Sequence, residues 1–227
     1  MKCDEVLNGQ CANIGRMTGA SPTRERLPPW HERVTLSNGR QVLIRPIRPE
    51  DGEPLRAGFG LLEPDEIRQR FLHTVKELTP ETAERLTHVN PRNEFALVVA
   101  EPLPPGEALI GAVARVALDE NGRDAEFAIL VSRYIKHMGL GRYLMTRLVK
   151  WAKGKKLNRL YGDVLENNGP MLSLAQSLGF QREFHQDSPG LVRVTLELKP
   201  RSNNRTPSDQ QRSSAQPQQN QDRNRPG

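Results

Sequence analysis

The chain has 227 residues, of which only 36% are hydrophobic, and it carries a net charge of +6. This length leaves room for one folded domain with polar extensions. The absence of any run of about 18 apolar residues excludes a membrane-spanning helix. The first residues contain no apolar stretch of the kind that secretory signals need, so we expect a cytoplasmic protein that does not associate with membranes.

The two ends of the chain differ in composition from its middle. Residues 200–227 consist almost entirely of Ser, Asn, Gln, Arg, Asp and Pro, so we predict a disordered, polar and basic tail. Residues 1–31 show no apolar period and are predicted to form a second flexible segment, which leaves residues 32–199 as the folded domain. The domain carries a net charge of only +2, which argues against a dedicated nucleic-acid-binding domain. A solvated tail is favoured over one that contacts nucleic acid or anionic lipid.

The first predicted element is a β-hairpin, in which Asn38-Gly39 forms the turn between β-prone runs at 34–36 and 42–44. Acidic residues after Pro49 then indicate the start of a helix. Three amphipathic patterns follow, and the third opens with Thr79-Pro80, a capping residue followed by proline at the first helical position. We expect these helices over 53–62, 64–73 and 79–89.

The second half of the chain alternates strands with helices. Short turns separate its first three strands, which predicts antiparallel neighbours. A helix begins after Gly139-Leu140-Gly141, with apolar residues at helical spacing as far as Trp151. We expect strands over 95–100, 108–118, 126–131, 159–165, 180–184 and 191–198, and a further helix over 170–178. The pattern predicts an α/β (α+β) fold, with a mixed, mostly antiparallel sheet of six or seven strands flanked by helices.

The most informative segment is a strand, a loop and a helix between Ala125 and Trp151. Its loop reads Lys136-His137-Met138-Gly139-Leu140-Gly141, with two glycines where the helix starts. Unpaired amides and the helix dipole favour an anion at such a place, and glycine lets a phosphate approach the backbone. The loop is not a dinucleotide fingerprint, which needs a third glycine, nor a Walker loop, which needs Gly-Lys-Ser/Thr. On spacing alone, a tight turn without a ligand remains open.

Three segments, in the right order, resemble motifs of the GNAT superfamily of N-acetyltransferases. The loop resembles the family's Gln/Arg-x-x-Gly-x-Gly/Ala motif, with Lys136 in the leading position, His137 where many relatives have Gly, and Met138 where many have a basic residue. The segment from Asn168 to Phe180 is similar to the family's Asn-x-x-Ala ending, and the segment from Ile44 to Asp51 to a common first strand and helix start. The whole run most resembles the acetyltransferase domain of bacterial Pat-type protein-lysine acetyltransferases.

This resemblance implies a GNAT fold in which two splayed strands form a cleft for acetyl-CoA, without a metal ion. One strand pairs with the pantetheine and the acetyl carbonyl, amides at the helix start hold the pyrophosphate, and one Asn faces the cofactor. The implied cofactor-binding residues are Ile129, Leu130, Val131, Lys136, His137, Met138, Gly139, Leu140, Gly141, Arg142 and Asn168. The implied acceptor is a primary amine, with a protein lysine favoured. The sequence carries no signal for the oligomeric state.

Glu126 corresponds in position to the glutamate that some members of the family use as a general base. A lysine amine, with a pKa near about 10.4, must lose a proton before it attacks the thioester. A partly buried carboxylate has a raised pKa, which suits a base, although a solvated or salt-bridged Glu126 stays open. Ala175 stands where relatives often have the Tyr that protonates the leaving thiolate. This departure and the Lys136-His137-Met138 run favour, as an alternative, a non-catalytic GNAT-like module that binds acyl-CoA as a sensor or scaffold.

Overall fold

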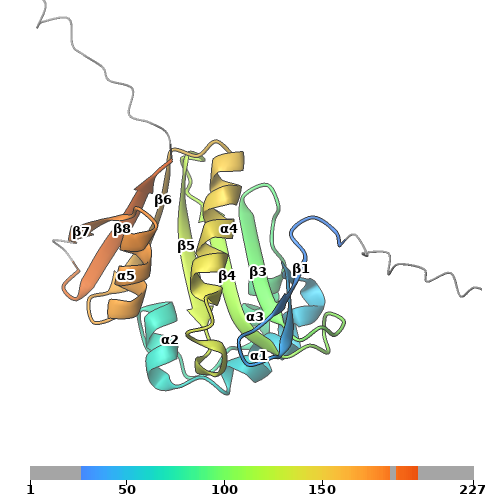
Figure 1. The fold of residues 1–227 in the computed structure, drawn as a ribbon. Helices are drawn as coiled ribbons and strands as arrows, with labels where there is room; N and C mark the ends of the chain where they lie inside the picture. The colour runs from blue at the N-terminus through green and yellow to red at the C-terminus, as the bar shows by residue number, and fades with distance from the viewer. Residues whose placement is uncertain (1–26, 185–187, 199–227) are drawn as a thin grey trace, which may run out of the picture.

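The structure, a computed structural model, describes residues 27–184 and 188–198. Within these residues one sheet runs in the order β1-β2-β3-β4-β5-β6-β8-β7 (Figure 1). Its strands are β1 (Glu32–Thr35), β2 (Gln41–Pro46), β3 (Glu94–Ala100), β4 (Ile110–Leu118), β5 (Asp124–Val131), β6 (Arg159–Leu165), β7 (Gln181–Phe184) and β8 (Leu191–Glu197). The predicted flexible segment lies outside the described residues as far as residue 26, and the predicted tail at 200–227 lies outside them entirely.

Five α-helices occur in the described residues. They are α1 (Gly52–Phe59), α2 (Pro64–Phe71), α3 (Pro80–Thr87), α4 (Leu140–Gly154) and α5 (Gly169–Ser177). Two 3-10 turns, η1 (Pro49–Asp51) and η2 (Arg133–Ile135), precede α1 and α4. None of the helices in this part of the chain is long and apolar enough to cross a bilayer.

The sheet is mixed and mostly antiparallel, as predicted. Among the described strands, β5 and β6 form the only parallel pair, and all other neighbours are antiparallel. The eight strands of the described chain exceed the predicted six or seven. The two edge strands, β1 and β7, are only four residues long and correspond to the runs predicted at 34–36 and 180–184. Both pair with a neighbour in the sheet, which brings the number of strands to eight.

Local turn and capping signals place several elements where the sequence predicts them. Gly39 adopts a φ of 82°, and the Leu36 N–H donates to the Arg40 carbonyl at 2.8 Å, which closes the β1–β2 hairpin. Thr79 caps α3 by accepting a hydrogen bond from the Thr82 N–H at 3.3 Å. Such interactions join residues a few positions apart, so they can be read from the sequence alone.

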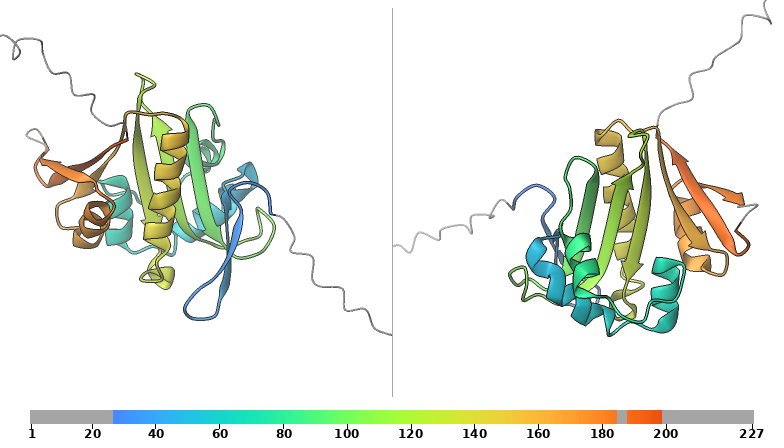
Figure 2. Two further views of the ribbon diagram at one scale, coloured as in Figure 1. Left: turned by 45° about the horizontal axis from the view of Figure 1, so that its top comes forward. Right: turned by 180° about the vertical axis from the view of Figure 1, so that it is seen from behind.

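Helices cover both faces of the sheet. In Figure 2, α4 crosses one face while α1 and α3 lie on the other. The predicted apolar side of α4 is confirmed, because Leu144 and Leu148 are fully buried against the sheet. Trp151 belongs to the same core, where its ring stacks on Phe95 at 5.6 Å between centroids. Trp30 adds a third ring at 4.8 Å from Phe95, so the chain packs on the domain before β1 begins.

A buried ion pair joins Arg45, near the end of β2, to Asp51 of η1. Arg45 and Asp51 are 2% and 0% exposed, and two guanidinium nitrogens donate to the two carboxylate oxygens at 2.7 and 2.8 Å. Asp51 also accepts a hydrogen bond from the Arg48 N–H at 2.8 Å. The pair therefore fixes the end of β2 against η1, at the entry to the helical layer.

The pairing of β5 with β6 is short. Only Asp124, Ala125 and Glu126 have register partners on β6, and beyond them the two strands diverge (Figure 1). Gly162, directly after the last pair, has no room for a side chain: a Cβ atom there would lie 3.0 Å from the Phe127 carbonyl oxygen and 2.9 Å from its ring. The contact between Gly162 and Phe127 thus occupies the point from which the strands separate.

Replacing Gly162 by alanine is expected to destabilise the fold by about 1–3 kcal/mol, because the extra methyl group meets backbone that cannot move aside cheaply. Urea unfolding measures this loss. Gly154→Ala is the matched control, since a Cβ there meets nothing within 4 Å and alanine favours a helix. Equal urea midpoints for the two variants would show that the close contact between Gly162 and Phe127 does not matter for the fold at the point where the strands separate.

Candidate functional site

A cleft of about 530 Å³ opens where β5 and β6 diverge. Its walls come from β5, β6, the loop before α4 and the start of α5, with α2 across the opening. The volume lies within the range of about 300–1,000 Å³ that is typical of ligand sites. Nine predicted site residues line it: Glu126, Ile129, Leu130, Val131, Lys136, His137, Leu140, Gly141 and Asn168.

The other three predicted residues belong to the same loop and helix start but do not line the cleft. Met138 packs against the main core, which accounts for an apolar residue at this position. Gly139 is the N-cap of α4 and adopts a φ of 77°. The Arg142 guanidinium is exposed and donates to the Ser177 hydroxyl at 2.7 Å, which joins α4 to α5.

The loop ends in an open helix terminus. Within α4 the first turn closes when the Tyr143 N–H donates to the Gly139 carbonyl at 3.1 Å. The preceding amides, of Leu140, Gly141 and Arg142, are those that a helix start leaves without an intrahelical partner. With the helix dipole they favour an anion at the end of the cleft.

The backbone at His137 explains why many relatives have glycine there. Its φ of 62° lies in the left-handed region, which glycine adopts without strain and which histidine tolerates better than most residues. The loop therefore keeps the same path with a histidine. The imidazole is added to the cleft wall, where glycine would have no side chain.

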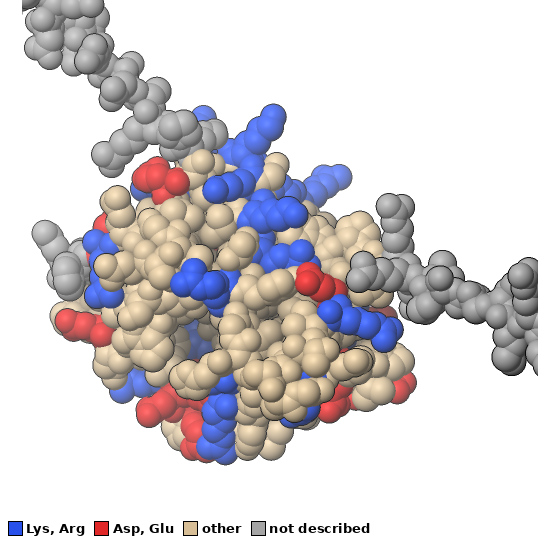
Figure 3. Space-filling model, viewed as in Figure 1, with Lys and Arg blue, Asp and Glu red and all other residues tan. Residues whose placement is uncertain are grey.

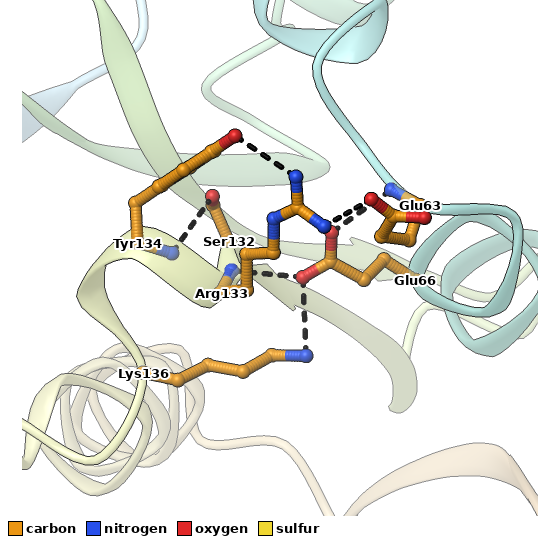
Figure 4. A network of polar contacts seen from close by, with 6 residues as sticks. All are labelled: Glu63, Glu66, Ser132, Arg133, Tyr134 and Lys136. Atoms are coloured by element: carbon orange, nitrogen blue, oxygen red, sulfur yellow. Dashed lines mark hydrogen bonds and ion pairs between the residues drawn. The ribbon is translucent and has the colours of Figure 1, made fainter.

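Glu66 of α2 anchors the segment that leads into the loop. Its buried carboxylate accepts hydrogen bonds from the Arg133 N–H at 2.8 Å and from the Glu63 N–H at 3.1 Å, and it pairs with the Lys136 ammonium at 3.1 Å (Figure 4). The Arg133 guanidinium pairs with the exposed Glu63 carboxylate. Lys136, the leading residue of the motif, is thus held by α2 in this structure.

The pKa of Glu66 reflects this arrangement. Burial raises the pKa, but the hydrogen bonds from the Glu63 amide, Lys136 and the Arg133 amide outweigh burial, so that the pKa lies below its ordinary value of 4.5. A carboxylate with a lowered pKa stabilises the fold above its ordinary pKa and loses that contribution as the pH falls through its folded value.

Glu66→Gln is expected to cost about 1–3 kcal/mol at pH 7, because an amide group then faces donors inside the protein. The difference from the unaltered protein should begin to shrink as the pH falls below about 4.5 and should be smallest below the lower folded pKa of Glu66, where the folded protein itself binds the proton. Thermal unfolding between pH 2 and pH 7 measures both effects. Glu63→Gln serves as the control, since that side chain is 51% exposed and its ion pair is worth about 0–1 kcal/mol. A loss that does not vary with pH would contradict a role for the charge.

The edge of β5 that faces β6 has no strand partner from Phe127 to Val131 among the described residues. On its other edge β5 pairs with β4 from Ala125, which is opposite Leu118, to Val131, which is opposite Ala112. Main-chain groups on such an edge are available to an extended ligand. Ile129, Leu130 and Val131 lie in this stretch, next to the helix start that favours an anion.

Glu126 lies at the closed end of the cleft, beside the last β5–β6 pair. Its carboxylate is open to solvent, yet the surrounding protein displaces part of its hydration, and this desolvation raises its pKa above the ordinary value. Repulsion from Asp163 raises it further, while Arg193 and Arg70 oppose the shift. Asp163 lines the cleft and is bound to Arg193 by two contacts of 2.8 Å. A carboxylate poised in this way suits proton acceptance.

The helix α5 supplies the last wall. Asn168 caps it, accepting a hydrogen bond from the Met171 N–H at 3.2 Å, and also lines the cleft. Ala175 is completely buried in the core and offers no proton donor. Within the described chain, no Ser, Thr, Tyr or Cys lines the cleft, so no hydroxyl or thiol replaces the missing tyrosine there.

Basic side chains gather over α4 on the face seen in Figure 3. The sequence leaves open a contact between the 153–156 run and a phosphate of the ligand. These residues lie at the far end of α4, about 20 Å from the loop at a rise of about 1.5 Å per residue. Lys155 instead donates to the carbonyls of Pro91 and Arg92 at 3.2 Å each. The run therefore does not extend the site at the loop.

Sequence reasoning misses the contribution of α2. Glu66, Gln69, Arg70, Phe71 and Leu72 all line the cleft, although the helix precedes β5 by more than 50 residues. The amphipathic pattern predicts the helix but not its partner. No signal in the sequence marks this contribution, because the burial of Glu66 is visible only in the structure.

Comparisons with known proteins agree with this architecture. The family model described as "Acetyltransferase (GNAT) domain" matches residues 41–181. An acetyltransferase of Pseudomonas aeruginosa is 30% identical over 169 residues, which cover 74% of this chain and 89% of that protein. The GNAT domain of S. lividans PAT has the same fold, with a TM-score of 0.65 at 22% identity over 76% of this chain and 99% of that one. An N-acetyltransferase of Staphylococcus aureus Mu50 reaches a TM-score of 0.56 at 20% identity over 70% and 99% of the two chains. The chain belongs to the GNAT acetyltransferase family.

Proposed function

We propose that this protein is an N-acetyltransferase that moves the acetyl group of acetyl-CoA to a primary amine, the side chain of a protein lysine. The observation that carries the proposal is the cleft between β5 and β6, which has an open helix terminus at one end and Glu126 at the other. The family membership supports acyl-CoA-dependent N-acetyltransferase activity.

The proposed binding mode divides the work between backbone and side chains. Amides from His137 to Arg142 hold the pyrophosphate, and the unpaired edge at Ile129, Leu130 and Val131 pairs with the pantetheine and the acetyl carbonyl. Asn168 faces the pantetheine from the start of α5. Backbone donors suit this task because they are fixed in place before the ligand arrives.

In the proposed reaction the amine nitrogen attacks the thioester carbonyl directly. A C–N bond forms, the C–S bond breaks, and Glu126 accepts the proton that the amine loses, directly or through water. The leaving thiolate takes its proton from water, since the described cleft wall holds no hydroxyl or thiol. No metal ion takes part in this scheme.

The choice of a protein lysine, and of the cytoplasm as location, belongs to the proposal. The likeness of the motifs to Pat-type enzymes supports the lysine. The fold shared with the S. lividans PAT domain is compatible with it, although at 22% identity that likeness speaks for the fold alone.

A second candidate is a non-catalytic acyl-CoA sensor or scaffold. The buried Ala175 favours it, because the family's usual proton donor is missing. The two candidates differ in one product. A sensor binds acetyl-CoA without releasing thiol, whatever amine is present, whereas the enzyme releases one thiol for each amide formed.

Titration calorimetry with acetyl-CoA, followed by thiol release in the presence of lysine-containing proteins, separates the outcomes. We expect heat of binding and thiol release that depends on the acceptor, with acetyl-lysine detected by mass spectrometry. Binding without thiol release from any amine would favour the sensor. The absence of any binding heat would remove both candidates.

A further inference from the structure

An apolar cavity of about 310 Å³ lies on the face of the sheet that α1 and α3 cover. Its walls include Phe59, Leu78, Leu86 and Val113, and apolar surface dominates them. The cavity adjoins the cleft, because Arg70, Phe71, Leu130 and Ile135 line both. A ligand group that leaves the cleft on this side therefore meets an apolar space, with the guanidinium of Arg70 at its entrance.

Arg70 stands at this junction, where Glu126 is close enough to attract it but does not bond to it. Within residues 27–184 and 188–198 its guanidinium makes no hydrogen bond or ion pair, and it lies 5.0 Å from the centroid of the Phe71 ring. Nearby Arg115 is occupied, since it donates to Glu94 at 2.7 Å and to the Leu86 carbonyl at 3.0 Å. Burial, and repulsion from Arg115, lower the pKa of Arg70 to about 10, although the attraction of Glu126 opposes this shift. The surroundings of Arg70 thus favour an added anion.

The register of β5 places the base on the same wall. Alternate residues of a strand share one face, so Glu126, Ala128 and Leu130 point to the side of the cavity. Ala128 is opposite Arg115, lines the cleft beside Glu126 and contributes only a methyl group. The carboxylate of Glu126, the guanidinium of Arg70 and the apolar cavity therefore lie close together on this side of the sheet.

We infer that the acceptor is a peptide segment in which the target lysine has an acidic residue and an apolar residue beside it. The lysine amine lies at Glu126, the acidic side chain pairs with Arg70, and the apolar side chain enters the cavity. This inference rests on the proposed function and adds the class of acceptor sequence. A guanidinium and a carboxylate form strong charge-assisted hydrogen bonds, and burial of an apolar side chain adds affinity.

Three blocked peptides test it on the full chain with saturating acetyl-CoA. The first carries Leu and Asp beside a single lysine, the second has Asn for Asp, and the third has Ser for Leu. We expect kcat/KM to fall at least tenfold for the second peptide and several-fold for the third. Equal values for all three in the unaltered protein would overturn the inference and leave the proposed function standing.

Arg70→Gln locates the effect. The tenfold preference for Asp over Asn should shrink to less than twofold in this variant, as a double-mutant cycle requires of groups in contact. Arg68→Gln is the matched control, because Arg68 is exposed on the same helix and lines neither cavity, and it should keep the full preference. If the Arg70 variant kept the full preference for Asp over Asn, Arg70 would not be the group that binds the acidic side chain. Should Arg70→Gln fail to fold, the peptide series alone decides.

A free amino acid is the competing occupant, since its carboxylate could also meet Arg70. Free leucine is therefore assayed beside the peptides. Acetylation of leucine with no acetylation of any lysine peptide would overturn both the inference and the proposed acceptor. Acetylation of the peptides with the stated preference supports both.

Discussion

Glu126→Gln is expected to lower kcat/KM by about 10²-fold at neutral pH, the smaller end of what a general base contributes. The glutamine keeps the size of the side chain but cannot accept the proton of the attacking amine. The loss should narrow at high pH, where more of the amine arrives already deprotonated. Initial rates with acetyl-CoA and a lysine peptide between pH 6 and pH 10 provide the measurement. Glu166→Gln is the control, because that residue is exposed and does not line the cleft.

The same variant should be more stable than the unaltered protein. Desolvation and Asp163 raise the pKa of Glu126 above its ordinary 4.5, so folding favours the protonated form. The charged form therefore weakens the fold. This penalty grows as the pH rises above 4.5, is complete above the folded pKa, and is removed by glutamine. The melting temperature should rise at pH 7.5, and the gain should vanish below about pH 4.5. An unchanged rate in Glu126→Gln would refute the role of the base, whatever its stability.

The largest expected effect on stability comes from the Arg45–Asp51 pair. Asp51→Asn or Arg45→Met leaves one charge buried without its partner, which costs about 3–5 kcal/mol. Small domains are stable by only about 5–15 kcal/mol, so either change approaches the limit of folding. Urea unfolding at pH 7 measures it. The double change Arg45→Met with Asp51→Leu should recover most of the loss, because no isolated charge remains.

The double variant also keeps the test decisive if either single variant fails to fold. The pair of Arg56 and Glu53 on α1 provides the contrast, and Glu53→Gln should cost no more than about 1 kcal/mol because the Glu53 side chain is 79% exposed. If breaking the Arg45–Asp51 pair cost equally little, burial would not determine how much that pair contributes to stability.

The elements that the sequence predicts well are those whose causes lie close together in the chain. Thr79 caps α3 through a hydrogen bond from an amide three residues away, and Asn38-Gly39 forms the turn of a hairpin between adjacent strands. The buried residues of α4 recur every three or four positions. The loop between β5 and α4 belongs to the same class, since its glycine and the helix start follow one another directly. The fold and the candidate cleft could therefore be predicted, and nine of the twelve predicted site residues line that cleft.

Distant partners could not be predicted. Glu66 contacts Arg133 across 67 positions, and nothing near either residue records the other. In the sequence, Gly162 is simply a glycine inside a predicted strand. Only the structure shows that a Cβ atom there would lie within 3 Å of Phe127. Arg70 looks like the solvated side of an amphipathic helix, and only the packing of α2 beside β5 brings it between two cavities. Such contacts depend on how whole elements pack together, which a local pattern does not encode.

One helix borders both of the proposed substrate sites. Through Glu66, α2 holds the approach to the loop, and through Arg70 it borders the space assigned to the acceptor. Any displacement of α2 caused by one substrate therefore changes the affinity for the other, and thermodynamic linkage makes the two factors equal. Saturation with coenzyme and saturation with peptide should shift each other's dissociation constants by the same ratio, a heterotropic effect inside a single domain.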